Sequence, residues 1–190
     1  MNILLLDNYD SFTYMLRDYI EQHGATCTVV RNDHQDAIAM ALAADAIILS
    51  PGPGAPKDAG LLMKVIEEVY AFKPVLGVCL GHQAIGEFFG ATLQKATVPM
   101  HGKVDYITRS ENQLFAGIPR TFQATRYHSL LLTHIPEQLI TIATSAKGEV
   151  MALTHKQLPL WGIQFHPESC LTEYGSMMIK NFLLAATPKQ

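Results

Sequence analysis

The stretch Pro74-Val75-Leu76-Gly77-Val78-Cys79-Leu80-Gly81-His82-Gln83 decides the fold of this chain. Residues 74–78 form an apolar run that predicts a buried strand, and residues 80–89 predict a helix that Gly90 closes. Cys79 lies between them, with a glycine two residues away on each side. A sharp turn from strand through nucleophile to helix needs small flanking residues, because its backbone is strained and crowded. The stretch therefore predicts an α/β fold with a nucleophile elbow at Cys79.

The segments that precede the elbow alternate between strand and helix signals. Asp10 or Ser11 is predicted to cap the first helix, and Gly24 to end it. The expected order is strand, helix, strand, helix, strand and helix, at residues 2–6, up to about 23, 26–30, 36–44, 46–49 and 61–70. Continuous apolar strands separated by helices predict a mostly parallel sheet with helices on both faces.

The second half of the chain has strand signals with short connections, which predict a smaller antiparallel portion. The expected strands cover residues 121–132, 139–144, 149–155 and 160–165, and a last helix covers 174–185. The sequence contains no repeat, low-complexity segment or linker. A single domain over residues 1–190 is therefore expected.

Composition excludes several classes of function. The chain has 190 residues, of which 48% are hydrophobic and 16% charged, and a net charge of -3. These values predict a globular protein that binds no nucleic acid. No stretch approaches the ~20 apolar residues that span a membrane. The three cysteines are few and odd in number, which indicates free thiols in a reducing compartment, the cytoplasm. Zinc-binding spacings are absent from the sequence, so no metal is expected on this chain.

Cys79 is the predicted nucleophile. At the N-terminus of a helix, the helix dipole favours its reactive thiolate form. The backbone N–H of Leu80 is placed to stabilise an oxyanion. The simpler interpretation, a buried structural cysteine, suits an average cysteine better, but the two flanking glycines reverse that preference. Cys27 and Cys170 lack this context and are interpreted as structural.

His166 is the predicted base. It lies in Gly162-Ile163-Gln164-Phe165-His166-Pro167-Glu168-Ser169, at the end of an apolar strand, where open α/β sheets place their active sites. Glu168 is two residues further on, projects to the same side of an extended chain, and can orient the imidazole. A strand-end histidine beside a solvated glutamate is common, and only the elbow makes a Cys/His/Glu set the better explanation. His82 is expected to pack within the fold.

Several motifs in the observed order resemble class I glutamine amidotransferases. They are Pro51-Gly52-Pro53-Gly54, the segment 77–83 and Phe165-His166-Pro167-Glu168-Ser169. Three further segments resemble the small subunit shared by anthranilate synthase and aminodeoxychorismate synthase. The second of these enzymes serves para-aminobenzoate and folate synthesis. These are Asp7-Asn8-Tyr9-Asp10-Ser11-Phe12-Thr13-Tyr14, Met100-His101-Gly102-Lys103 and Arg126-Tyr127-His128-Ser129-Leu130. The resemblance covers residues 2 to about 184.

The resemblance implies a role for each matching residue. Cys79 becomes the nucleophile, His166 the base and Glu168 its orienter. The backbone N–H groups of Gly52 and Leu80 form the oxyanion hole. The implied glutamine-binding residues are Gly52, Pro53, Gly54, Gln83, Ser129 and Leu130.

The resemblance also implies the reaction and the partner. L-glutamine would be hydrolysed to glutamate through a γ-glutamyl thioester, and ammonia would pass to a chorismate-using synthase large subunit. No cofactor is expected on this chain, and magnesium is expected on the partner. His101, Gly102 and Lys103 become candidate partner contacts, although a simple surface turn would explain them too.

Two other functions remain open alternatives. One is a stand-alone γ-glutamyl hydrolase or glutaminase on the same architecture, and the other is a non-enzymatic relative, a class that typically loses a triad member. The sequence departs from the family at Met15, where relatives carry asparagine, and at Cys170, where they carry an aliphatic residue. Whether the partner makes anthranilate, aminodeoxychorismate or both is left open by these motifs.

Overall fold

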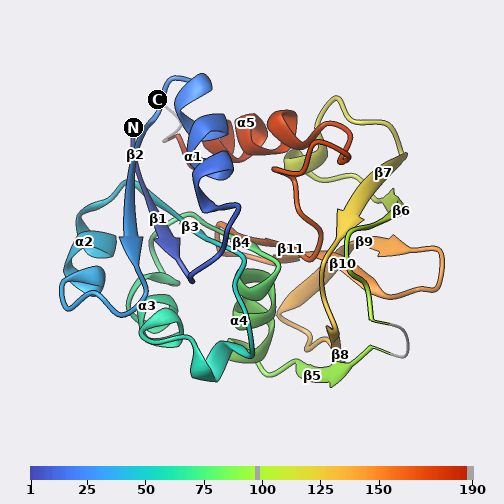
Figure 1. Ribbon diagram of the computed structural model, residues 1–190, viewed down its shortest axis with the longest axis horizontal. Helices are drawn as coiled ribbons and strands as arrows, with labels where there is room; N and C mark the ends of the chain where they lie inside the picture. The colour runs from blue at the N-terminus through green and yellow to red at the C-terminus, as the bar shows by residue number, and fades with distance from the viewer. Residues whose placement is uncertain (97–98, 188–190) are drawn as a thin grey trace.

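The computed structural model describes residues 1–96 and 99–187 (Figure 1). The predicted domain of residues 1–190 thus includes two short segments, 97–98 and 188–190, outside the described residues. In the described part, nine strands form one sheet in the order β2-β1-β3-β4-β11-β10-β9-β6-β7. This mixed sheet confirms the predicted α/β class.

The first five strands in that order pair in parallel, as predicted. They are β2 (Thr26–Arg31), β1 (Asn2–Asp7), β3 (Ala46–Leu49), β4 (Val75–Val78) and β11 (Leu160–Ile163). Strand β11 is the last strand in the chain, yet it lies beside β4, which carries the elbow. The carboxyl ends of β4 and β11 therefore lie at the same edge of the sheet.

The remaining strands of the large sheet pair antiparallel and continue it beyond β11. They are β10 (Val150–His155), β9 (Leu139–Ser145), β6 (Lys103–Arg109) and β7 (Thr121–Arg126). A separate antiparallel pair joins β5 (Thr92–Lys95) to β8 (Leu130–Thr133).

Helices cover both faces of the parallel part (Figure 1). Two helices, α1 (Thr13–Gln22) and α5 (Gly175–Ala186), pack together on one face. The opposite face carries α2 (Ala37–Ala43), α3 (Leu62–Val69) and α4 (Leu80–Phe88). The short 3-10 turns are η1 (Pro56–Asp58) and η2 (Gln113–Phe115). Among the described residues, no helix is both long and apolar enough to cross a membrane.

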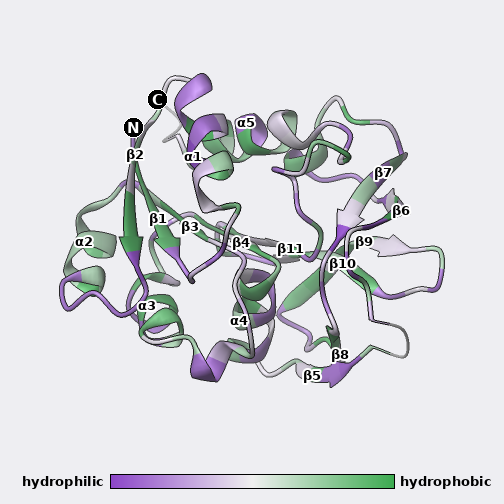
Figure 2. Ribbon diagram, in the orientation of Figure 1, coloured by the Kyte–Doolittle hydropathy of each residue, from purple (hydrophilic) through white to green (hydrophobic). Residues whose placement is uncertain are grey.

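Alternation along the central strands divides the core into two layers. Ile3 and Leu5 of β1 pack toward α1 and α5, whereas Leu4 and Leu6 pack toward α2, α3 and α4. A slip of one residue would exchange the two faces, so this alternation fixes the register. Each fully buried Leu or Ile contributes about 1.5–3 kcal/mol relative to exposure. Figure 2 shows the hydrophobic colour on β1 and on much of α5.

The predicted helix cap was wrong. Helix α1 begins at Thr13 with Phe12 as its N-cap residue, and no side chain caps it. The Asp10 carboxylate accepts the N–H of Phe12 instead, at 2.7 Å. Asp10 therefore orders the turn before the helix rather than the first helical turn. Gly24 follows the helix with φ of +81°, as predicted for a residue that ends it.

The predicted strand over residues 121–132 was also wrong, because the structure divides it. Strand β7 belongs to the large sheet and β8 to the small one, and residues 127–129 turn between them. Strands β5 and β6 were not predicted. The predicted strand 160–165 is shorter, since β11 ends at Ile163 and the chain turns before His166.

Candidate active site

Cys79 lies at the junction of β4 and α4, as the elbow pattern predicts. It is the N-cap residue of α4, with φ of 50° and ψ of -98°. A side chain at positive φ costs about 1–3 kcal/mol, and such strain is typical of functional sites. The Cys79 N–H donates to the Ile163 carbonyl at 2.8 Å, which fastens the elbow to the end of β11. The first N–H groups of α4, beginning at Leu80, have no acceptor within their own helix.

The glycines of the elbow are required by close backbone contact. A Cβ atom on Gly77 would lie 2.4 Å from the carbonyl carbon and oxygen of Gly81. A Cβ atom on Gly81 would lie 2.5 Å from the carbonyl oxygen of Leu49 in β3. Both distances are shorter than any real Cβ contact, so a larger residue would force the strand and helix apart.

His166 and Glu168 form a buried pair next to the elbow. His166 Nδ1 lies 2.6 Å from Glu168 Oε1, and Glu168 is fully buried. A carboxylate can only accept, so Nδ1 carries the hydrogen and Nε2 is left for another partner. The predicted contact between His166 and Glu168 is present, but residues 167–168 form a turn. The expectation that an extended chain would bring the two side chains together was therefore wrong. The His166 N–H donates to the Thr125 carbonyl at 3.0 Å, which ties this turn to β7.

The pKa of His166 reports its neighbours. Burial alone lowers the pKa, but hydrogen bonding and charge from Cys79 and Glu168 outweigh it and raise the pKa to about 10. His166 Nε2 is buried and forms no hydrogen bond with any of the described residues. Cys79 thus acts on the His166 pKa, while Nε2 is left without a well-formed hydrogen bond. Cys79 and Glu168 therefore favour the protonated imidazolium form of His166.

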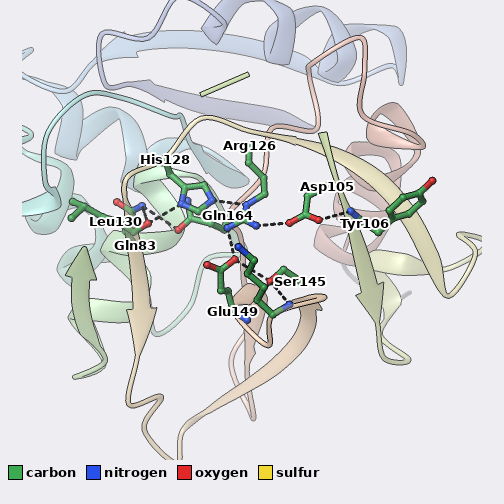
Figure 3. Close-up of polar contacts among 10 residues, drawn as sticks. Gln83, Asp105, Tyr106, Arg126, His128, Leu130, Ser145, Glu149 and Gln164 are labelled. Carbon is green, nitrogen blue, oxygen red and sulfur yellow. Dashed lines mark hydrogen bonds and ion pairs between the residues drawn. The ribbon is translucent and has the colours of Figure 1, made fainter. Parts of the chain in front are cut away.

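A chain of amides joins Gln83 and Leu130, two predicted glutamine-binding residues, to Gln164 (Figure 3). Gln83 Nε2 donates to the Leu130 carbonyl at 3.3 Å and to Gln164 Oε1 at 3.1 Å. Gln164 Nε2 lies 3.6 Å from Cys79 Sγ. The structure thus brings Gln83 and Leu130 together, whereas Ser129 is exposed. Gln164 was not predicted as a site residue; its only signal was its place in the 162–169 motif.

The Pro51–Gly54 segment is fixed by buried amides and a hydroxyl. The Asn8 N–H donates to Ser50 Oγ at 2.8 Å, and Asn8 Nδ2 donates to the Ser50 carbonyl at 2.8 Å. A Cβ atom on Gly52 would lie 2.6 Å from Asn8 and 2.8 Å from the Leu80 side chain. Gly52 is therefore placed beside the residue that follows the nucleophile, whereas Pro53 and Gly54 are exposed.

The candidate partner segment lies against the active site. The backbone N–H of Met100 donates to the His128 carbonyl at 2.9 Å. Lys103, the first residue of β6, lies opposite Arg126 in the pairing of β6 with β7. The His101 ring lies 5.7 Å from the Tyr127 ring, centroid to centroid. The Tyr127 ring in turn lies 5.0 Å from His166, with the ring planes near perpendicular. Residues 100–103 thus contact the base through one aromatic side chain.

The two other cysteines and His82 differ from Cys79 in their surroundings. Cys27 is buried in β2, where burial raises the pKa of its thiol to about 12. Cys170 is exposed, so its interpretation as a structural residue was wrong. His82 is fully buried, as expected for a packing residue. Within the described part of the chain, no group of three or more histidine, cysteine or acidic side chains could hold a metal ion.

The fold and this grouping of thiol, imidazole and carboxylate define an α/β protein with a site of the cysteine–histidine–carboxylate type. The chain belongs to the class I glutamine amidotransferase family, whose sequence profile matches residues 4–186. The resemblance found in the motifs is thereby confirmed.

Relatives carry two kinds of name. The chain is 46% identical to "Anthranilate synthase component 2" of Azospirillum brasilense, over 95% of this chain and 94% of that protein. It is 43% identical to "Aminodeoxychorismate synthase component 2" of Klebsiella aerogenes, over 95% of this chain and 98% of that one. A Thermoplasma acidophilum crystal structure, described as that of one component of a GMP synthase, superposes with a TM-score of 0.89, at 27% identity, over 98% of this chain and 94% of that one.

Proposed function

We propose that this chain hydrolyses L-glutamine with Cys79 as nucleophile, His166 as base and Glu168 as the residue that orients the imidazole. The observation that carries this proposal is the position of the strained Cys79 and the buried His166–Glu168 pair at the ends of β4 and β11. A nucleophile, a base within reach and a group that fixes the base are the three parts that covalent catalysis requires.

The reaction follows from the arrangement of these three groups. The Cys79 thiolate attacks the side-chain amide carbon of glutamine, and the carbonyl oxygen becomes an oxyanion. The N–H groups of Gly52 and Leu80 stabilise it, each by about 3 kcal/mol of the barrier. His166 Nε2 protonates the leaving nitrogen and ammonia departs. The same nitrogen then takes a proton from water, which hydrolyses the γ-glutamyl thioester to glutamate.

Glutamine is held by the amide chain in this proposal. Both hydrogens of Gln83 Nε2 are already donated, so Gln83 has only its Oε1 to offer a substrate. An acceptor suits the α-ammonium group of glutamine. The backbone of Ser129 and Leu130 and the Gly52–Gly54 turn complete the binding surface. These steps use side chains and backbone of this chain, with no metal or organic cofactor.

We propose further that the chain works as the small subunit of a chorismate-using synthase. Relatives over nearly the whole chain are named component 2 of anthranilate synthase or of aminodeoxychorismate synthase. Ammonia reacts only while unprotonated, so a closed route to an acceptor site on the partner is the expected arrangement. Magnesium is expected on that partner. Relatives of both names match at 46% and 43% identity, and co-purification of the large subunit would decide between the two partners.

Residues 100–103 are the proposed partner contact. A ligand on this segment would press on Tyr127, which contacts the His166 ring. Docking would then align Nε2 with the sulfur, a contact that lacks good hydrogen-bond geometry in the isolated chain. The isolated subunit should therefore be a poor glutaminase that its partner activates.

The experiment that tests the function uses Cys79→Ala in complex with the large subunit. Glutamine-dependent product formation should disappear, while formation from added ammonium salts should persist, because the acceptor chemistry lies on the partner. Cys27→Ala and Cys170→Ala should retain both activities. Glutamine-dependent turnover in Cys79→Ala would overturn the assignment. Full glutaminase activity in the isolated wild-type chain would instead favour the stand-alone glutaminase.

A further inference from the structure

Gln164 is a fully buried amide that the mechanism above does not use. It follows directly after β11, and its Nε2 lies 3.6 Å from Cys79 Sγ. Its other end, Oε1, accepts a hydrogen bond from Gln83 Nε2 at 3.1 Å. An N–H donor directed at a sulfur favours the thiolate over the thiol, because the hydrogen bond is stronger to a charged acceptor.

The direction of the Gln164 amide is set by Gln83. Gln83 Nε2 donates both to Gln164 and to the Leu130 carbonyl. Rotating the Gln83 amide by half a turn would place its oxygen against two other oxygens. Such an acceptor-to-acceptor contact in a buried site is costly. Gln83 therefore keeps its nitrogen toward Gln164, and Gln164 keeps its own nitrogen toward the sulfur.

The Leu130 carbonyl is held in turn by His128. His128 Nδ1 lies 3.0 Å from the Leu130 oxygen, and its Nε2 lies 3.0 Å from Arg126 Nε. An arginine nitrogen can only donate, so His128 Nε2 must accept and Nδ1 must carry the hydrogen. Burial and the neighbouring Arg126 charge lower the pKa of His128 to about 4, which keeps the ring neutral.

Arg126 anchors the far end of this chain. It is 2% exposed, and its two terminal nitrogens lie 2.5 Å from Asp105 Oδ2 and 2.6 Å from Glu149 Oε2. Ser145 Oγ donates to the same Glu149 oxygen at 3.0 Å. Figure 3 shows this group, which joins β6, β7 and the β9–β10 turn to the residues around Gln83. Every arm of the guanidinium is thus committed, and the His128 tautomer is fixed.

We propose that Gln164 is a further active-site residue, which donates its amide hydrogen to the Cys79 sulfur and stabilises the thiolate before attack. Arg126 and His128 are positioning residues that act through Leu130 and Gln83. No proton is transferred along the chain; each hydrogen stays on its donor. The inference rests on the proposed role of Cys79 as nucleophile.

The test measures thiolate formation directly, without glutamine or a partner. In a chain carrying Cys27→Ser and Cys170→Ser, alkylation of Cys79 by iodoacetamide is followed against pH. Gln164→Met keeps the length of the side chain and removes the donor. We expect the midpoint of its pH–rate profile to rise by about one unit, the size expected for loss of one hydrogen bond to a charged group. The rate below the midpoint should fall about tenfold.

The titratable groups that surround the sulfur stay in place in Gln164→Met. The nearest are His166, which acts on Cys79, and Glu168, and further from the sulfur in this network are His128 before β8 and His82 in α4. The shift therefore reports the amide alone. A matched control is Asn181→Leu, which also removes a buried amide. The Asn181 amide donates to the Leu114 and Ala116 carbonyls and takes no part in the hydrogen bonds around Cys79. The substitution should lower stability and leave the alkylation profile unchanged.

The positioning role is tested at His128. His128→Leu cannot donate to Leu130, and we expect its midpoint to shift in the same direction as that of Gln164→Met, by a smaller amount. His128→Gln has both a donor and an acceptor and should restore most of the wild-type profile. An unchanged profile in Gln164→Met would overturn the inference while leaving Cys79 as the nucleophile. A Cys79 that alkylates no faster than a free thiol in the wild type would instead count against the proposed function.

Discussion

The backbone at Cys79 allows its strain to be measured apart from its chemistry. At φ of 50°, any side chain with a Cβ atom is strained, whereas glycine is not. Replacing Cys79 by Ala keeps the strain, and replacing it by Gly releases about 1–3 kcal/mol. Glycine also loses more chain entropy on folding, which costs about 0.5–1 kcal/mol relative to alanine. Cys79→Gly should therefore match or exceed the stability of Cys79→Ala.

Cys27 provides the matched control. It is also a buried cysteine, but it lies in β2 and its φ is not positive. There, glycine should be less stable than alanine by at least the entropic cost of about 0.5–1 kcal/mol. The loss of the Cβ atom and the entropy of glycine are common to both sites. Subtracting the two Gly-minus-Ala differences leaves the strain at Cys79, about 1–3 kcal/mol.

The assay is urea unfolding of the four variants. Trp161, the single tryptophan of the chain, is 3% exposed in β11 and reports unfolding by fluorescence. Equal denaturant slopes would show that the unfolded states are comparable. If glycine is less stable than alanine by the same amount at both positions, the elbow stores no strain and the reasoning is refuted.

Three other predictions concern the base, acid stability and the partner. His166→Ala should lower the steady-state glutaminase rate far more than Glu168→Gln, because in the proposed mechanism His166 transfers protons and Glu168 only orients it. Equal losses at matched stability would contradict these roles. Burial lowers the pKa of His82 to about 3, so its stabilising contribution is present above pH 6.5 and is lost as pH falls toward 3. Stability should then decrease by about 1.4 kcal/mol per pH unit in that window, and urea titrations of His82→Leu should lack this share of the slope. His101→Ala or Lys103→Ala should weaken activation by the large subunit and leave the small basal glutaminase rate unchanged. The measurement is a titration of glutaminase rate against partner concentration. Curves that superpose on that of the wild type would show that residues 100–103 are not part of the interface.

The parallel half of the fold could be predicted because its signals are local. An apolar run between turn residues identifies each buried strand, and the contact between Gly77 and Gly81 requires the glycines that mark the elbow. The division of residues 121–132 into β7 and β8 could not be predicted in this way. Arg126 interrupts the apolar run, but it is buried by Asp105 and Glu149, which are distant in sequence. Such long-range pairing leaves no local pattern.

The candidate site shows the same limit. His166 and Glu168 are close in sequence, and their contact was expected, although it forms across a turn. Gln164 was missed because a single amide after an apolar strand has no recognisable spacing. Its importance depends on Cys79 and Gln83, which approach it only when β4 and β11 pair. Cys79 and His166 could be predicted together because each lies in a recognisable motif, whereas Gln164 has no such signal of its own.

Several features that destabilise the fold lie at the candidate site. Cys79 has a strained backbone, Glu168 buries a carboxyl group with one oxygen unpaired in the described structure, and His166 Nε2 has no well-aligned partner. Each would cost about 1–3 kcal/mol, a large part of the net stability of a domain. If a glutamine side chain bound between Gly52, Leu80 and His166, its carbonyl oxygen would accept hydrogen bonds from the N–H donors. Its amide carbon would then lie in reach of the Cys79 sulfur. Such costs are expected of a site organised for the proposed substrate and its oxyanion.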